Sequence, residues 1–146
     1  MPTHRDVDTW EVSAEATERI RAAMPVCTTL GITASRFDAE EVVLTLPWSA
    51  ELCTSGGLLH GGVLMTLADA AGGACAFVNL PEGAVGTSTI ESKTNFVGAV
   101  RDGDVTATAR PLHVGSTTIV VETELVANGR MVAKTTQTQI VLRPRQ

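Results

Sequence analysis

The segment from His60 to about residue 78 constrains the fold most, because it is a long apolar run that carries one carboxylate, Asp69, near its middle. Apolar helix interiors rarely contain Asp, since burying an ionised carboxylate without partners costs free energy. Gly72 and Gly73 each destabilise a helix by about 1 kcal/mol relative to Ala, so a helix that tolerates both is stabilised by packing. The segment therefore predicts a buried central helix in which Asp69 is either satisfied or used.

Patterns on both sides of this helix predict an α+β fold. Residues 13–23 are typical of a helix that Ser13 caps and Pro25 ends, within an N-terminal helical segment of residues 1–28. Residues 30–37 and 42–46 predict a hairpin with its turn at residues 38–41. Four runs after the central helix predict four consecutive antiparallel strands: residues 87–97, 104–114, 117–127 and 131–142. We therefore expect one domain, residues 1–146, with a curved antiparallel sheet wrapped around one long helix.

Composition and charge exclude several classes of function. Hydrophobic residues make up 44% of the chain, charged residues 18%, and the net charge is −5, which argues against a nucleic-acid or acidic-membrane partner. The three cysteines, Cys27, Cys53 and Cys75, show no metal-binding spacing and fit reduced thiols in a cytoplasm, so we expect no metal site. Residues 1–6 lack the apolar core of a signal peptide, and we expect no apolar run of membrane-spanning length.

One face of the central helix has the character of a site. Gly62, Thr66, Asp69 and Gly73 follow one another at spacings of four, three and four, so they form one stripe along the helix. Glycines on this stripe allow a ligand or another backbone to approach closely. The stripe is therefore typical of an interface or a binding site and not of a solvated face.

The start of the helix is a second candidate feature. The first N–H groups of a helix lack internal partners, so those of Gly61 and Gly62 can polarise a carbonyl or hold an oxyanion. Asp69 follows Gly61 by eight residues, which is about 12 Å along the axis, whereas catalytic contacts need about 3 Å. If both features serve one reaction, they come from two copies of the helix. We therefore predict a dimer with two sites at its interface.

Two segments carry a resemblance to a known family. Residues 58–69, Leu-Leu-His-Gly-Gly-Val-Leu-Met-Thr-Leu-Ala-Asp, and residues 89–96, Thr-Ile-Glu-Ser-Lys-Thr-Asn-Phe, resemble the hotdog-fold acyl-CoA thioesterases, in particular the PaaI-like branch related to the 4-hydroxybenzoyl-CoA thioesterases. The likeness extends over nearly the whole chain. It implies hydrolysis of an aryl- or medium-chain acyl-CoA, with coenzyme A as part of the substrate and no separate cofactor. It also implies a homodimer that pairs into a tetramer.

The resemblance assigns roles to particular residues. Asp69 would be the catalytic carboxylate, as nucleophile or as general base on water, and the Gly61 N–H would polarise the thioester carbonyl. His60 would shape the thioester end of the site, and the Thr89 hydroxyl would help to hold the water. Thr54 stands where many relatives have Asn or Gln, so a shorter side chain takes the position that orients the thioester or the water.

The resemblance also leaves the phosphate-binding residues open. Ser116-Thr117 stands where relatives often carry basic residues, so other residues would bind coenzyme A. The candidates are Gly62 at the start of the helix and three cations, Lys93, Arg101 and Arg130. These three residues are equally typical of solvated strand and turn positions.

Structural roles remain as alternatives for the candidate residues. Asp69 can be a carboxylate that a buried hydroxyl satisfies, His60 an N-cap, Thr89 an ordinary strand residue, and Cys75 an inert buried thiol. Two other functions also remain open: a hotdog enoyl-CoA hydratase, whose usual motifs this sequence lacks, and a non-catalytic acyl-CoA sensor.

Overall fold

The computed structural model describes residues 11–146, so the prediction about residues 1–6 and the first ten residues of the predicted helical segment 1–28 lie outside the described part of the chain. The elements in chain order are α1 (Ala14–Ala23), α2 (Pro25–Thr29), β1 (Thr33–Phe37), β2 (Val42–Leu46), the 3-10 helix η2 (Ala50–Leu52), α3 (Gly61–Val78), β3 (Gly86–Phe96), β4 (Val105–Val114), β5 (Thr118–Ala127) and β6 (Arg130–Leu142). The predicted helices and strands are all present within a few residues of their expected bounds.

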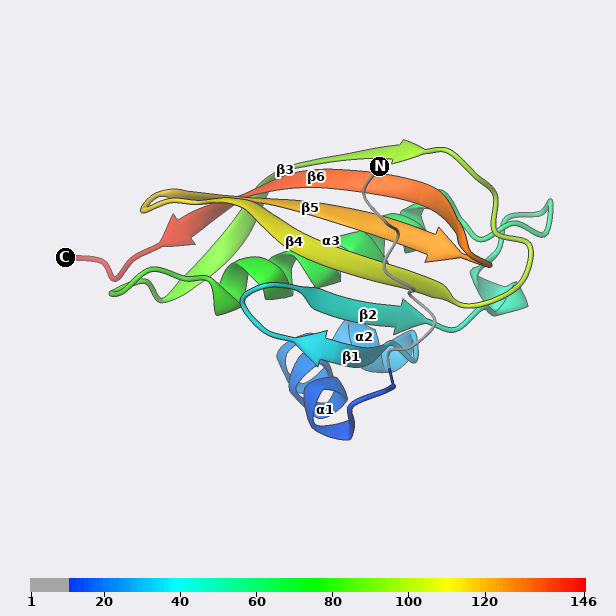
Figure 1. The fold of residues 1–146 in the computed structure, drawn as a ribbon, viewed down its shortest axis with the longest axis horizontal. Coiled ribbons are helices and arrows are strands. Elements are labelled where there is room, and N and C mark those ends of the chain that lie inside the picture. The colour runs from blue at the N-terminus through cyan, green and yellow to red at the C-terminus, as the bar shows by residue number, and fades with distance from the viewer. Residues whose placement is uncertain (1–10) are drawn as a thin grey trace.

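The six strands form one antiparallel sheet in the order β1-β2-β4-β5-β6-β3. The sheet curves around α3, which packs against all six strands, while α1 covers β1 at one edge (Figure 1). This is the predicted α+β architecture of a curved sheet around one central helix, as in the hotdog fold.

Small side chains let α3 lie close to the sheet. Its buried face is largely alanine, including Ala68, Ala71 and Ala76, so the helix axis approaches the strands without large side chains between them. The facing strands supply the larger apolar groups, and in β5 burial alternates at every second residue from Ile119 to Ala127. The core is therefore a layer of aliphatic side chains between one helix and one sheet.

By length and composition alone, α3 is long and apolar enough to cross a membrane. The expectation that no apolar run reaches membrane-spanning length is therefore wrong. Half of this helix is buried inside the fold, and the burial is on the face toward the sheet. The apolar character of α3 is thus explained by the core that it fills.

Two local features differ from the sequence expectations. Pro25 does not merely follow α1; it is the first residue of α2, where its fixed φ suits a helix start. β3 does not pair with its successor β4 but lies at the far edge, next to β6. The connection between β3 and β4 passes the start of α3, where the Leu59 N–H donates to the Val100 carbonyl at 2.9 Å.

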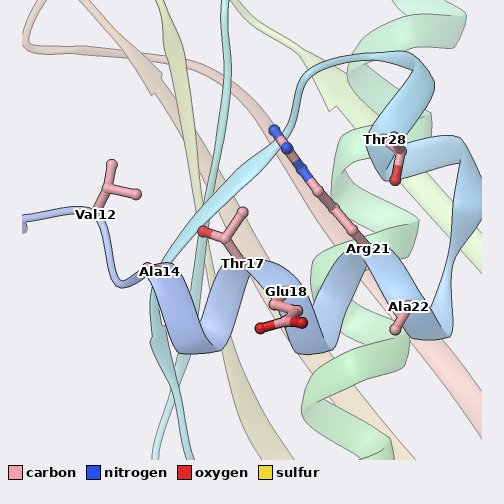
Figure 2. A pocket seen from close by; sticks show the side chains of 7 residues that line it. All are labelled: Val12, Ala14, Thr17, Glu18, Arg21, Ala22 and Thr28. Atoms are coloured by element: carbon pink, nitrogen blue, oxygen red, sulfur yellow. The ribbon is translucent and has the colours of Figure 1, made fainter.

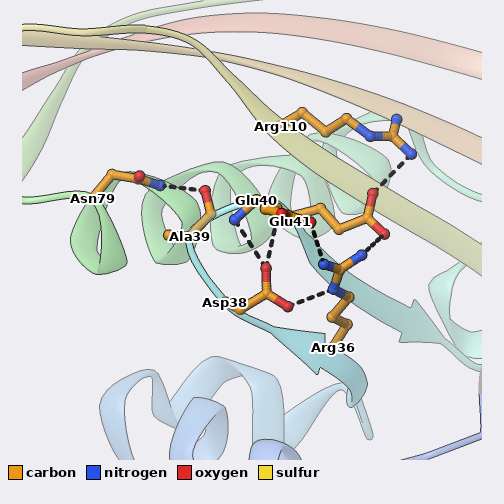
Figure 3. Close-up of polar contacts among 7 residues, drawn as sticks. All are labelled: Arg36, Asp38, Ala39, Glu40, Glu41, Asn79 and Arg110. Carbon is orange, nitrogen blue, oxygen red and sulfur yellow. Dashed lines mark hydrogen bonds and ion pairs between the residues drawn. The ribbon is translucent and has the colours of Figure 1, made fainter.

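An ionic cluster fixes the β1–β2 turn (Figure 3). The buried Glu41 carboxylate accepts from Arg36 at 2.5 Å and from Arg110 on β4 at 2.8 Å. Asp38 pairs with Arg36 and also accepts two backbone N–H groups of the turn, at 2.9 and 3.1 Å. Asn79, which ends α3, donates to a carbonyl of the same turn at 3.0 Å. The cluster ties the first hairpin to β4 and to the end of the central helix.

Candidate active site

The stripe predicted along α3 is the face of the helix that the sheet leaves open. Gly62 and Asp69 are exposed, and Thr66 and Gly73 are half-buried, whereas most neighbouring positions of the helix are buried. The Asp69 carboxylate is therefore not a core residue; it lies at the surface of an otherwise apolar helix.

Two side chains hold the Asp69 carboxylate from the adjoining strands. The Thr89 hydroxyl on β3 donates to Asp69 Oδ1 at 3.1 Å, and Gln137 Nε2 on β6 donates to the same oxygen at 3.2 Å. The Thr89 hydroxyl, which was expected to help hold the water, thus lies against the Asp69 carboxylate itself. Gln137 was missed, because the residues from Lys134 to Gln139 are all polar and show no apolar alternation that marks which of them face inward.

A second buried amide continues this network. Gln139 Nε2 donates to the Thr89 hydroxyl oxygen at 2.5 Å, and the Thr87 hydroxyl donates to Gln139 Oε1 at 2.8 Å. Gln137 and Gln139 are each only 1% exposed, although both side chains are polar. Buried polar groups of this kind are stable only when they are hydrogen-bonded, and here the bonds converge on Asp69.

A glycine of α3 makes room for one of these amides. A Cβ at Gly72 would lie 2.1 Å from Gln137 Oε1, so the helix has no side chain where the amide packs. Gln137 Oε1 is also buried without a hydrogen-bond partner among the described residues. The amide therefore turns its nitrogen toward Asp69 and its oxygen toward Gly72.

A cleft of about 410 Å³ opens beside Asp69. It has an apolar wall from α1, β1 and α3 and a more polar wall from β3 and β6. Its lining consists of Ile20, Ala23, Met24, Phe37, Asp69, Gly73, Ala74, Phe77, Gly86, Thr87, Ser88, Thr89 and Gln139. Its volume lies in the range of small-molecule sites. The cleft extends from Asp69 toward the end of α3, away from Gly61.

The start of α3 is capped by His60. Its Nδ1 accepts the Gly62 N–H at 2.9 Å, so His60 is an N-cap and the Gly62 N–H is not free, contrary to expectation. The Gly61 N–H has no acceptor among residues 11–146. The Phe96 ring would lie 3.2 Å from a Cβ at Gly61, which leaves little room for a side chain there.

Within one chain the candidate residues fall into two groups. Asp69 and Thr89 line the cleft, whereas Gly61, His60 and Thr54 do not. The Thr54 hydroxyl accepts the Gly56 N–H at 3.3 Å in the loop before α3 and contacts neither Asp69 nor Thr89 by a hydrogen bond. This separation agrees with the distance expected from the helix geometry.

None of the candidate cations lines the cleft, and Arg101 follows Val100, whose carbonyl accepts the Leu59 N–H just before α3. Arg101 is in the turn before β4 and Arg130 begins β6, and Asn128 joins the two turns through hydrogen bonds to Asp102 at 2.9 and 3.2 Å. Lys93 is exposed on β3. None of the three cations forms an ion pair within residues 11–146.

The cysteines offer no nucleophile near Asp69. Burial, with a smaller contribution from Asp38, raises the pKa of the Cys75 thiol to about 12, so it stays protonated at neutral pH. Burial also raises the pKa of Cys27. Cys53 Sγ donates to the Ser49 carbonyl at 3.5 Å in the loop before α3. In the described part of the chain, no three His, Cys, Asp or Glu residues are grouped as metal ligands.

A second hollow, of about 540 Å³, lies along the outer side of α1 (Figure 2). Its lining includes Glu18 and Arg21 but no residue of the Asp69 cleft. Arg21 already donates to the Ile32 carbonyl at 2.9 Å. The cleft at Asp69 is therefore the better candidate for a site of chemistry.

Comparison with known proteins agrees with this geometry. The family model described as "Thioesterase superfamily" matches residues 56–134, which include α3, β3 and most of the sheet. A candidate esterase from Saccharolobus solfataricus is 36% identical over 102 residues, covering 69% of this chain and 71% of that protein. The 1,4-dihydroxy-2-naphthoyl-CoA hydrolase of Escherichia coli is 30% identical over 99 residues, covering 67% and 72%.

Solved structures agree as well. A mutant thioesterase from Pseudomonas aeruginosa superposes with a TM-score of 0.80 at 27% identity, covering 89% of this chain and 96% of that one. A thioesterase family protein from Silicibacter pomeroyi superposes with a TM-score of 0.79 at 29% identity, covering 90% and 98%. This chain therefore belongs to the thioesterase superfamily.

Proposed function

We propose that the protein hydrolyses an acyl-CoA thioester to a free acid and coenzyme A, with Asp69 as the catalytic carboxylate. The observation that carries this proposal is the position of Asp69, which is exposed on an apolar helix, held by Thr89 and Gln137, and opens on a cleft of about 410 Å³. A carboxylate with only a structural role would have no need of such a cleft.

The chemistry has two forms that share the same residues. As general base, Asp69 takes a proton from water while the water oxygen bonds to the carbonyl carbon; the C–S bond then breaks, and the thiolate takes up the proton. As nucleophile, Asp69 bonds to that carbon and expels the thiolate, and water hydrolyses the resulting anhydride. In both forms a Gly61 N–H polarises the carbonyl oxygen and stabilises its developing charge.

We infer that the Gly61 N–H comes from the second chain of a dimer. β3 supports this inference, because it is an eleven-residue edge strand that is mostly exposed on both faces, with Ile90 60% and Phe96 49% exposed. Long unprotected edge strands pair readily with another strand. Pairing of two β3 strands would bring the open stripes of two α3 helices together.

The same arrangement divides the substrate between the two chains. We infer that the acyl group occupies the cleft that extends from Asp69 toward Phe77 in one chain. The coenzyme A phosphates would lie on the other chain, beside its Gly61, where Arg101 and Arg130 are free of ion pairs within the described residues and Lys93 is exposed. Arginine binds phosphates through bidentate, charge-assisted hydrogen bonds, and lysine binds them as a point charge.

The first test measures coenzyme A release from a panel of acetyl-, octanoyl-, benzoyl- and crotonyl-CoA. We expect Asp69→Asn to lower kcat by about 100-fold or more, since it removes the base or nucleophile. Glu82→Gln, which removes an exposed carboxylate in the loop after α3, is the charge-matched control and should retain activity. An Asp69→Asn variant as active as Glu82→Gln would refute the mechanism. Binding without hydrolysis would favour the sensor, and hydration of crotonyl-CoA would favour the hydratase.

A single-turnover reaction in ¹⁸O-water distinguishes the two forms of the chemistry. If Asp69 is the nucleophile and water attacks the Asp69 carbonyl of the anhydride, the first turnover yields acid without the label and leaves the label on the Asp69 carboxylate. If Asp69 is the general base, the label appears in the acid from the first turnover and never on Asp69.

A further inference from the structure

We propose that Gln137 and Gln139 are positioning residues that fix the Asp69 carboxylate so that its Oδ2 atom faces the water or the thioester. This inference rests on the proposed function and adds to it the identity of the reactive oxygen. Both donors to the carboxylate, Thr89 and Gln137, bond to Oδ1, and no donor among residues 11–146 bonds to Oδ2. A terminal carboxylate torsion is soft, so two donors on one oxygen are what hold it in place.

The direction of the hydrogen bonds is determined by the amides. A hydroxyl has one proton to donate, and the Thr89 oxygen already accepts from Gln139 at 2.5 Å, which leaves its own proton for Asp69 at 3.1 Å. Thr87 donates to Gln139 Oε1 at 2.8 Å and so keeps the amide nitrogen toward Thr89. The series from Thr87 through Gln139 and Thr89 therefore donates in one direction and ends on the carboxylate.

The packing around Gln137 is unfavourable except as a support for Asp69. Its Oε1 is buried without a partner among the described residues, which destabilises a protein. Its amide also requires a glycine at position 72, in the middle of a helix, where glycine lowers helix stability. An apolar residue at 137 with alanine at 72 would avoid both costs. What the amide provides instead is a donor at 3.2 Å from Asp69 Oδ1.

The test compares the kinetics of Gln137→Met, Gln139→Met and Thr89→Val on the acyl-CoA that the wild type hydrolyses best. Gln137→Met and Thr89→Val each remove a donor to the Asp69 carboxylate, and Gln139→Met removes the donor to the Thr89 hydroxyl. We therefore expect kcat to fall by about 10- to 100-fold with KM nearly unchanged. Thr123→Val is the matched control, because Thr123 is fully buried in the sheet and its hydroxyl forms no hydrogen bond with this network or with any other described residue.

Double variants separate positioning from a general loss of structure. Gln139 acts through Thr89, so Gln139→Met should lower kcat no further in the Thr89→Val background. Gln137 reaches Asp69 directly, so Gln137→Met should lower kcat again in that background. The proposal would be overturned if the kcat losses of Gln139→Met and Thr89→Val multiplied in full in the double variant. It would also be overturned if Gln137→Met and Gln139→Met each had the same kcat as Thr123→Val.

A variant at the edge of the sheet keeps the proposal testable if the Met variants do not fold. Thr87 lies half-buried on β3, where valine is well tolerated, and Thr87→Val should lower kcat severalfold at constant KM. Unchanged kcat in Thr87→Val would contradict the role of Gln139. Because Asp69→Asn is measured in parallel, an inactive Asp69→Asn beside fully active Gln variants would reject the positioning proposal while the proposed function stands.

Discussion

Residues 72 and 73 are adjacent glycines with different reasons to lack a side chain. A Cβ at Gly72 would meet Gln137 Oε1 at 2.1 Å, whereas a Cβ at Gly73 would meet nothing within 4 Å. We expect Gly72→Ala to lower the free energy of unfolding by about 1–2 kcal/mol, because the clash outweighs the gain in helix propensity. Urea unfolding of the purified variant measures this value.

Gly73→Ala is the matched control for that experiment. It should raise the free energy of unfolding by about 1 kcal/mol, since it gains helix propensity without a clash. The clash also predicts coupling: in a Gln137→Ala background, Gly72→Ala should become stabilising. If Gly72→Ala is equally destabilising in both backgrounds, Gln137 is not the reason for the glycine.

Single residues were predictable where their own neighbourhood in the sequence is unusual. A carboxylate within an apolar helix pointed to Asp69, and a His before two glycines pointed to a helix start. Gln137 was not predictable in the same way, because it meets Asp69 across 68 residues of sequence. Which inward-facing residue of a strand reaches which turn of a helix depends on strand order and register, and local patterns do not encode these.

At the scale of the element, α3 forms the floor of the cleft from Asp69 to Phe77, two helical turns that span about 12 Å. Gly73 lies between them and faces open space. We expect Gly73→Leu to lower kcat/KM for octanoyl- or benzoyl-CoA by about 10-fold or more, because the new side chain occupies the volume of the acyl group. Activity on acetyl-CoA should change little.

The acyl-CoA panel provides the measurement, and Gly73→Ala is the graded control with a smaller effect in the same direction. Phe77→Ala should extend the cleft and shift the preference toward longer acyl groups. A Gly73→Leu variant with an unchanged ratio of octanoyl to acetyl activity would place the acyl group outside this cleft.

The β1–β2 turn provides a prediction about pH. Burial alone would raise the pKa of Asp38, but hydrogen bonds from Arg36 and from the backbone N–H groups of Glu41 and Glu40 outweigh it, and the pKa is lowered. A lowered folded-state pKa stabilises the fold above the unfolded value, near pH 4, and this stabilisation is lost as the pH falls through the folded value.

Asp38→Asn isolates this contribution, because it retains the oxygen that accepts the backbone N–H groups. We expect the variant to be less stable than the wild type at pH 7 and to approach it at pH 3, as measured by urea unfolding at each pH. A constant difference between the two proteins across this range would show that the charge of Asp38 does not contribute.

Elements were predictable from periodicity, but their neighbours were not. The strand from Gly86 to Phe96 was expected close to its observed bounds, yet its position at the edge beside β6 was not. The alternation of side chains reports which residues face inward within one strand. It carries no information on pairing between strands that are forty residues apart in the chain.

At the scale of the whole molecule, the described chain separates two halves of the proposed site. Asp69 lies at the cleft, and the unpaired Gly61 N–H lies at the start of the same helix, about 12 Å away along its axis. Variants that disable only one half are therefore informative. Gly61→Pro removes that N–H at the first position of the helix, where proline is favoured, and the ψ of 133° at His60 suits a residue before proline. Gly61→Ala keeps the N–H but places a Cβ 3.2 Å from the Phe96 ring, so it is the control for crowding by the new side chain.

Mixing these two disabled variants tests the shared site directly. Asp69→Asn and Gly61→Pro should each be nearly inactive alone, but after subunit exchange half of the dimers are mixed, and each mixed dimer contains one intact site. We therefore expect recovery of about a quarter of the wild-type activity, since half of the dimers are mixed and one of the two sites in each mixed dimer is intact. The double variant Asp69→Asn/Gly61→Pro, mixed with either single variant, is the control and should restore nothing. Only a site built from two chains is restored when two inactive variants are mixed. If the subunits exchange and no activity returns, Gly61 and Asp69 do not meet across an interface.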